Sequence, residues 1–146
     1  MSMDIEDMTT GCSYTSSVTL VITGENISPD EVTSIIGLIP NKVWKKGDER
    51  KFKNGRVFVY PWSGWKLLMD DEVADKGFEE QLAYWCAILF PRKEALEQIT
   101  SKSMSIFLEC YLSVEDQITT SVDNHLLTKL ASTGASLSFS IFHFKE

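Results

Sequence analysis

The sequence is poor in the residues from which most catalytic and metal sites are built. Only two histidines, His125 and His143, occur in 146 residues, and neither has a second histidine or a cysteine at metal-ligand spacing. G-x-S-x-G, H-E-x-x-H and P-loop motifs are missing, and Gly47, Gly55 and Gly64 are spaced like turns. We therefore expect no catalytic residue, no metal ion and no cofactor.

Cysteine is also scarce, and long apolar runs are missing. Cys12, Cys86 and Cys110 form no CxxC pair and are odd in number, which is typical of reduced, buried thiols in a cytosolic protein. Apolar runs such as residues 86–90 are far shorter than the roughly 20 residues that cross a bilayer. Residues 1–10 are acidic and lack the basic start and apolar core of a secretory signal. We expect a cytoplasmic protein with a flexible acidic tail (residues 1–11) and a single domain (residues 12–146).

Charge is unevenly distributed along the chain. The net charge is −7, yet residues 42–56 carry seven lysines and arginines against two carboxylates, a local +5, so the remainder sums to −12. An acidic body with one basic loop discourages general nucleic-acid binding and favours encounter with a basic protein. No motif indicates an oligomeric state.

The first half of the chain predicts a strand, a short helix and a hairpin. Residues 13–23 alternate between the two faces of a strand, and a capping box of Ser28, Pro29 and Glu31 begins a helix that Gly37 ends. A brief strand at residues 42–45 follows. Residues 51–53 and 56–60 flank Asn54-Gly55, which favours a hairpin turn with positive φ at both positions. Another strand runs to about residue 69, interrupted near residues 61–65.

The second half predicts helix, strand, helix and strand. A long helix is expected from about residue 76 to 101 with a break or kink at Pro91, then a strand at residues 104–114. Asp123 caps a further helix that ends at Gly134, and a final strand begins near residue 137. The order β-α-β-β-α-β-α-β predicts an α+β fold: one mixed or antiparallel sheet of five to seven strands, with about three helices packed mainly on one face.

Two features are candidates for contact with a partner. Acidic residues follow the interrupted strand into the next helix, and two tryptophans three positions apart face opposite sides of an extended chain, so one is expected to be exposed. Core packing around a bulge is the alternative for these tryptophans. The candidate partner-binding residues are Trp62, Trp65, Asp70, Asp71, Glu72, Asp75, Glu79 and Glu80.

Each charged feature also has an ordinary structural explanation. Carboxylates at helix starts and in polar loops are favoured by the helix dipole and stay solvated. The basic loop carries Trp44 and Phe52, with Tyr60 nearby, and cations interleaved with rings are typical of single-strand nucleic-acid binding. A hairpin with a charged exterior and inward rings has the same pattern, and lysines on sheet edges deter aggregation. We therefore expect no nucleic acid as a partner.

The order of short motifs carries a family resemblance. The segments are ISPDEV at 27–32, GLIP at 37–40, WKKG at 44–47, a tryptophan-centred strand at 62–67, LFPRKEAL at 89–96 and LASTG at 130–134. Over residues 14–142 the chain resembles the bacterial domain-of-unknown-function family 4279. The resemblance implies a compact bacterial cytoplasmic domain and brings no catalytic residues with it. Ser138 and Ser140 stand where acidic residues are expected in relatives.

Three classes of function follow from these features. Small acidic bacterial domains of this kind resemble immunity proteins, which neutralise toxins of contact-dependent or polymorphic systems, and the leading hypothesis is a non-enzymatic protein that docks its acidic surface on a basic, nuclease-type toxin. The alternative is a small-ligand or regulatory sensor domain with a pocket lined by Trp44, Trp62 or Trp65. The third is an enzyme with an unmarked acid/base pair.

Overall fold

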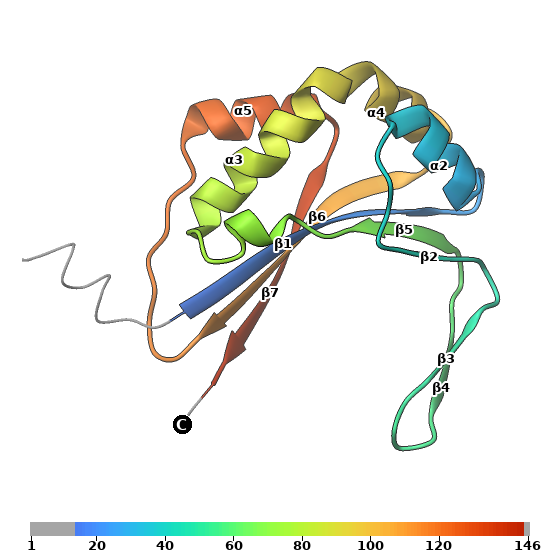
Figure 1. The fold of residues 1–146 in the computed structure, drawn as a ribbon, viewed down its shortest axis with the longest axis horizontal. Helices are drawn as coiled ribbons and strands as arrows, with labels where there is room; N and C mark the ends of the chain where they lie inside the picture. The colour runs from blue at the N-terminus through green and yellow to red at the C-terminus, as the bar shows by residue number, and fades with distance from the viewer. Residues whose placement is uncertain (1–13, 145–146) are drawn as a thin grey trace, which may run out of the picture.

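The structure, a computed structural model, describes residues 14–144, so the acidic tail predicted at residues 1–11 lies outside the described residues. Figure 1 shows the course of the chain through its strands and helices. The elements are β1 (Tyr14–Gly24), α2 (Pro29–Ile36), β2 (Lys42–Trp44), β3 (Glu49–Lys51), β4 (Val57–Val59), β5 (Ser63–Leu67), η1 (Asp71–Val73), α3 (Phe78–Leu89), η2 (Phe90–Arg92), α4 (Lys93–Thr100), β6 (Ser105–Val114), α5 (Asn124–Ser132) and β7 (Ser136–His143).

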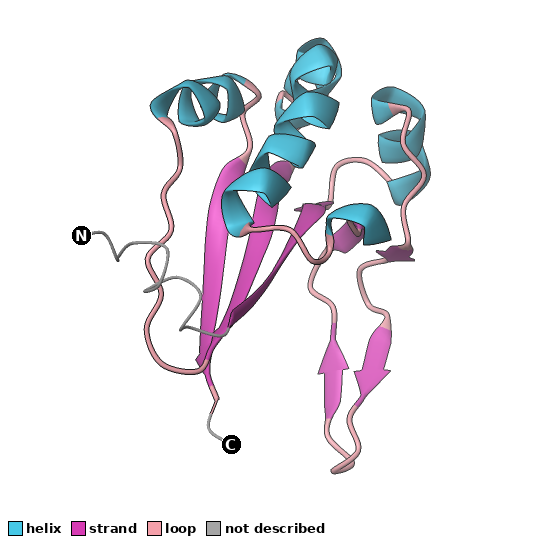
Figure 2. Ribbon diagram, turned by 60° about the vertical axis from the view of Figure 1, so that its left-hand side comes forward, coloured by secondary structure: helices cyan, strands magenta, loops and turns pink. Residues whose placement is uncertain are grey.

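Five strands form one mixed sheet in the order β2-β5-β1-β6-β7. β1 lies in the centre and is antiparallel to β5 and β6; β2 is antiparallel to β5, while β6 and β7 run parallel. The helices cover one face of this sheet (Figure 2). The predicted α+β class with helices on one face is therefore confirmed, and β3 and β4 form a separate two-stranded sheet.

Alternation in β1 determines which side chains face the helices. Val18, Leu20 and Ile22 have no exposed surface. Trp85 of α3 belongs to the same buried core, and its indole Nε1 donates a hydrogen bond of 2.8 Å to the carbonyl of Val18. Burial of each such large side chain contributes about 1.5–3 kcal/mol. The indole bond lets α3 bury a tryptophan without leaving a polar group unpaired.

The ends of α2 follow from its sequence. The Ser28 side chain accepts a hydrogen bond from the Glu31 backbone N–H at 3.2 Å, which satisfies one of the orphan donors at the helix start. Gly37 ends the helix with a φ of 75°, a left-handed conformation that favours glycine. The Ser28 cap and the Gly37 stop are confirmed, whereas the return bond from the Glu31 side chain that completes a capping box is not formed among the described residues.

The long helix predicted over residues 76–101 is divided at Pro91. α3 ends at Leu89, one 3-10 turn contains the proline, and α4 begins at Lys93. Arg92 fills the break, since its Nη1 donates to the Ile88 carbonyl at 2.8 Å and its Nε to the Ile36 carbonyl of α2 at 3.1 Å. None of the helices within residues 14–144 combines the length and the apolar character that crossing a membrane requires.

The hairpin of β3 and β4 projects from the sheet on the side away from the helices (Figure 1). Its turn differs from the prediction: Gly55 has a φ of 87°, but no residue between 14 and 144 other than glycine and Ser103 has a positive φ, so Asn54 does not. The Gly55 N–H donates to the Phe52 carbonyl, and Phe52 pairs with Arg56. The loop therefore has three residues and ends in a left-handed glycine, whereas a two-residue turn with two positive φ values was expected.

The face of the sheet opposite the helices is partly covered by its own long side chains. Val21 of β1 points to this face, yet only 2% of its surface is exposed. Lys66 of β5 and Glu109 of β6 form an ion pair of 3.8 Å, and Glu109 also accepts a hydrogen bond from the Tyr111 hydroxyl. The Tyr111 ring and the Lys66 and Glu109 side chains thus cover part of this face.

Candidate partner-binding surface

The predicted acidic residues lie together where β5 leads into α3. Asp70, Asp71, Glu72 and Asp75 belong to the connection through η1, and Glu79 and Glu80 to the first turn of α3. All are exposed except Glu79, which is partly buried. Residues 70–80 contain these six carboxylates and Lys76, a net charge of −5. We call this group the acidic surface.

A buried glutamine fixes the acidic surface to the core. Gln81 of α3 has no exposed surface. Its Nε2 donates to the carbonyls of Ser16 at 3.0 Å and Val73 at 3.1 Å, and its Oε1 accepts from the Ser16 hydroxyl at 2.7 Å. Gln81 therefore joins β1, η1 and α3 in one network, and the position of the carboxylates around η1 depends on it.

A tyrosine holds the other end of the η1 connection. The Asp70 backbone N–H donates to the Tyr84 hydroxyl at 3.2 Å. Burial raises the pKa of Tyr84, and the nearby Asp70 and Glu72 carboxylates raise it further. The phenol therefore stays neutral at physiological pH and keeps its place as an acceptor beside the acidic surface.

Two of the six carboxylates also have structural roles at helix starts. Glu79 Oε2 accepts from the Asp123 backbone N–H at 2.8 Å, which ties α3 to the start of α5, and Glu80 Oε1 accepts from the Gly77 N–H at 3.3 Å. Carboxylates at these positions are stabilised by the helix dipole. Asp71 and Glu72 make no side-chain hydrogen bond or ion pair with other residues of the described chain.

A groove of about 560 Å³ between α3 and α5 adjoins the acidic surface. Glu79 and Glu80 belong to both, and small or apolar side chains from α3, η2 and α5 line much of the remainder. The lining residues are Glu79, Glu80, Ala83, Cys86, Ala87, Phe90, Pro91, Asp123, His125, Leu126 and Lys129. We call this the α3–α5 groove. An acidic rim beside an apolar floor is chemically suited to a basic, amphipathic protein segment.

Cations lie at the far end of the α3–α5 groove. Lys129 and Lys93 place their ammonium groups 5.5 and 5.0 Å from the centre of the Phe90 ring. His125 is exposed at the start of α5, where its backbone N–H donates to the Asp123 carboxylate at 2.7 Å. The sequence did not point to this groove, because its walls are some 40 residues apart and no motif marks them.

A second groove, of about 710 Å³, lies between α2 and α4 and is lined largely by residues 90–95. The sensor alternative expected a pocket lined by Trp44, Trp62 or Trp65, and neither of these two grooves in the described chain contains them. Within residues 14–144, no three His, Cys, Asp or Glu side chains lie close enough to hold a metal ion.

Cys86 and Cys110 are free and buried, as predicted, while Cys12 lies outside the described residues. Burial raises the pKa of the Cys110 thiol to about 12, with a smaller effect from the Glu109 carboxylate. A thiol with this pKa carries almost no thiolate at neutral pH and is unreactive. His143, on β7, is exposed.

Comparison with family models assigns the chain to a family. A model described as a domain of unknown function (DUF4279) matches residues 13–143. The chain belongs to this family. The match spans every described element from β1 to β7 and confirms the resemblance seen in the order of the motifs. Searches of curated proteins and of solved structures found no match.

The two tryptophans of this DUF4279 domain have different roles. Trp62 is 48% exposed, next to the hairpin, whereas Trp65 has no exposed surface and donates from Nε1 to the Thr33 hydroxyl of α2 at 2.9 Å. The expectation that one of the pair is exposed is confirmed. Trp65 is removed from the candidate contact residues because it lies in the core. Trp62 also lies at the opposite end of β5 from the acidic surface, so the predicted residues do not form a single patch.

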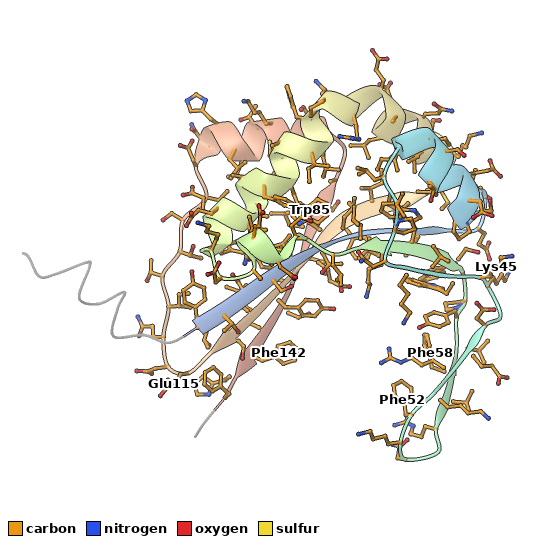
Figure 3. The ribbon with its side chains drawn as sticks, viewed as in Figure 1. Lys45, Phe52, Phe58, Trp85, Glu115 and Phe142 are labelled. Carbon is orange, nitrogen blue, oxygen red and sulfur yellow. The ribbon has the colours of Figure 1, made fainter. Side chains whose placement is uncertain are left out.

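Aromatic rings run from the sheet into the hairpin of the DUF4279 domain. Trp44 lies over Gly64 and stacks on Tyr60 with ring centres 5.1 Å apart, and Phe58 meets Tyr60 edge to face at 5.2 Å. Figure 3 shows Phe52 and Phe58 on the projecting hairpin, away from the helical layer. They are 43% and 44% exposed, so Phe52, one of the rings predicted to face inward, is only half covered, whereas Trp44 and Tyr60 are partly buried.

Proposed function

We propose that this DUF4279 domain is a non-enzymatic, cytoplasmic protein-binding domain that receives a basic protein partner on its acidic surface. The single observation that carries the proposal is the continuity between the acidic surface and the α3–α5 groove, since Glu79 and Glu80 belong to both. Carboxylates speed the encounter with a basic surface, and an apolar floor supplies the slow dissociation that charge alone does not.

The partner best suited to this surface is a basic toxin, and the protein then acts as its immunity protein. Nucleases present basic clefts because their substrate is a polyanion, and a surface with a net charge of −5 over residues 70–80 complements such a cleft. Blocking the cleft requires affinity and no bond-making chemistry. This function needs no cofactor, no metal and no nucleic-acid contact.

The test uses the protein encoded by the adjacent reading frame as the probe. The tagged full chain is co-expressed with that protein, and capture and protection of growth are measured. The double charge reversal Asp71→Lys/Glu72→Lys is expected to abolish both, because it reverses two exposed carboxylates. The control Glu94→Lys/Glu97→Lys makes the same change in net charge on α4 and is expected to retain both.

Two outcomes count against the proposal. One is an adjacent protein that is not toxic and is not captured. The other is full capture and protection by the Asp71→Lys/Glu72→Lys variant. That result would show that the acidic surface is not part of the contact.

A further inference from the structure

The hairpin of β3 and β4 exposes apolar side chains on both of its faces. We call residues 42–60, which include β2, β3 and β4, the basic arm. Val57 and Val59 point to one face of β4 and Phe58 to the other, and all three are 44–52% exposed. A two-stranded hairpin alone is marginally stable, so uncovered apolar groups on both faces indicate an interaction surface.

The charge of the basic arm determines the chemistry of what it binds. Residues 42–60 carry seven cationic side chains and two carboxylates, a net +5. Arg50 lies over the Phe52 ring at 5.1 Å, so cations and rings share one face of the arm. Aromatic and arginine side chains are the usual anchors of protein interfaces. The fitting occupant is an acidic surface with an apolar recess.

The chain itself presents such a surface. The acidic surface carries −5 over residues 70–80, equal and opposite to the charge of the basic arm, and the α3–α5 groove beside it has an apolar floor. Both halves of the match, charge and apolar contact, are therefore present on one molecule.

The two surfaces are kept apart within one molecule. The basic arm joins β5 at Ser63 and the acidic surface follows Leu67, and both residues are paired with β1, to Gly24 and Leu20. Figure 1 shows the hairpin and the start of α3 at opposite ends of β5. Because β5 is held in the sheet, the basic arm meets the acidic surface only on another copy.

We propose that the basic arm of one copy docks on the acidic surface and α3–α5 groove of a second copy, so that the protein associates with itself head to tail. The contact uses the same acidic surface as the proposed function, but it requires no other protein. Its test is made on the purified chain alone, so failure of self-association and failure of partner capture are separate results.

The experiment measures molar mass by sedimentation equilibrium at several protein concentrations. In about 0.01 M salt, where charges interact over ~30 Å, the mass is expected to rise with concentration above the 16.5 kDa of one chain. In about 1 M salt, where the range is ~3 Å, it is expected to return toward that value. Lys51→Glu/Lys53→Glu in the arm and Asp71→Lys/Glu72→Lys on the acidic surface should each weaken association at least ~10-fold.

Mixing the two variants gives the decisive result. Lys51→Glu/Lys53→Glu lowers the arm from +5 to +1 and leaves the acidic surface at −5, whereas Asp71→Lys/Glu72→Lys leaves the arm at +5 and brings the acidic surface to −1. Each variant alone therefore lacks one of the two surfaces. An equimolar mixture contains one unaltered arm and one unaltered acidic surface, so it is expected to recover association as a one-to-one dimer. Lys102→Glu and Glu94→Lys/Glu97→Lys reverse charges outside both surfaces and should leave association unchanged. All seven positions are exposed, so folding is expected to be retained, and circular dichroism checks it.

Three results overturn the proposal. The first is a measured mass of 16.5 kDa for the wild-type protein at every salt concentration. The lysines would then serve only to prevent aggregation at the edges of the hairpin. The second is association that persists in high salt. The same holds if the control variants weaken association as much as the surface variants do. The third is a mixture of the two surface variants that stays monomeric.

Discussion

Replacing Gln81 by methionine tests whether one buried amide fixes the acidic surface. Methionine has similar length and volume, so the packing of α3 changes little. It removes four hydrogen bonds and leaves the carbonyls of Ser16, Val73 and Ala74 without this donor. Each such bond contributes about 1 kcal/mol net, and a buried group without a partner costs about 1–3 kcal/mol. We expect a loss of about 2–4 kcal/mol in the free energy of unfolding.

Urea unfolding and calorimetry measure this loss. A chain of this size loses roughly 2–4 °C in Tm per kcal/mol, so Tm should fall by about 5–15 °C. Amide exchange at Val73 and Ala74 should also accelerate, because η1 is released from α3. Gln98→Met on α4, which is exposed, is the matched control and should lie within about 0.5 kcal/mol of wild type. A Gln81→Met variant as stable as that control would refute the reasoning.

Two further predictions concern the open face of the sheet. Gly64→Ala places a methyl group inside the Trp44 ring, so the unfolding free energy is expected to fall by about 1–3 kcal/mol, and an unchanged urea midpoint would contradict this. Burial and the hydrogen bond to Glu109 raise the pKa of Tyr111 from 10 to about 12. Because the folded-state pKa is the higher one, the stabilisation is complete below pH 10 and is lost as pH rises toward 12. In Tyr111→Phe this part of the pH dependence should disappear, and urea unfolding from pH 9 to 12 measures it; equal slopes in both proteins would count against it.

Local signals predicted the elements well because each depends on neighbouring residues. Ser28 and Gly37 bound α2, Pro91 divides the long helix, and alternation in β1 identified the buried face. The turn at Asn54-Gly55 was placed correctly, but its type was wrong, because Phe52 and Arg56 pair across a three-residue loop and only Gly55 has positive φ.

Features that depend on distant residues could not be predicted. The order of elements along the chain does not determine the order of strands in the sheet: β5 lies between β1 and β2, while β6 and β7 are adjacent. The walls of the α3–α5 groove are 32 to 50 positions apart in the sequence, and Gln81 binds Ser16 from 65 positions away. Of the candidate contact residues, the six carboxylates do lie together, but Trp62 lies at the other end of β5 and Trp65 in the core. A local sequence pattern does not show which residues from distant segments come together at one end of a strand.

The placement of the basic arm and the acidic surface at opposite ends of β5 gives the molecule a large electric dipole. β5 has five residues and extends about 16 Å, roughly twice the ~8 Å Debye length at physiological ionic strength. Salt therefore screens the basic arm and the acidic surface from each other in the cell. Binding of a partner at one of them leaves the electric field at the other almost unchanged. An approaching cationic body is turned toward the start of α3 and an anionic one toward the hairpin, although the chain as a whole is negative.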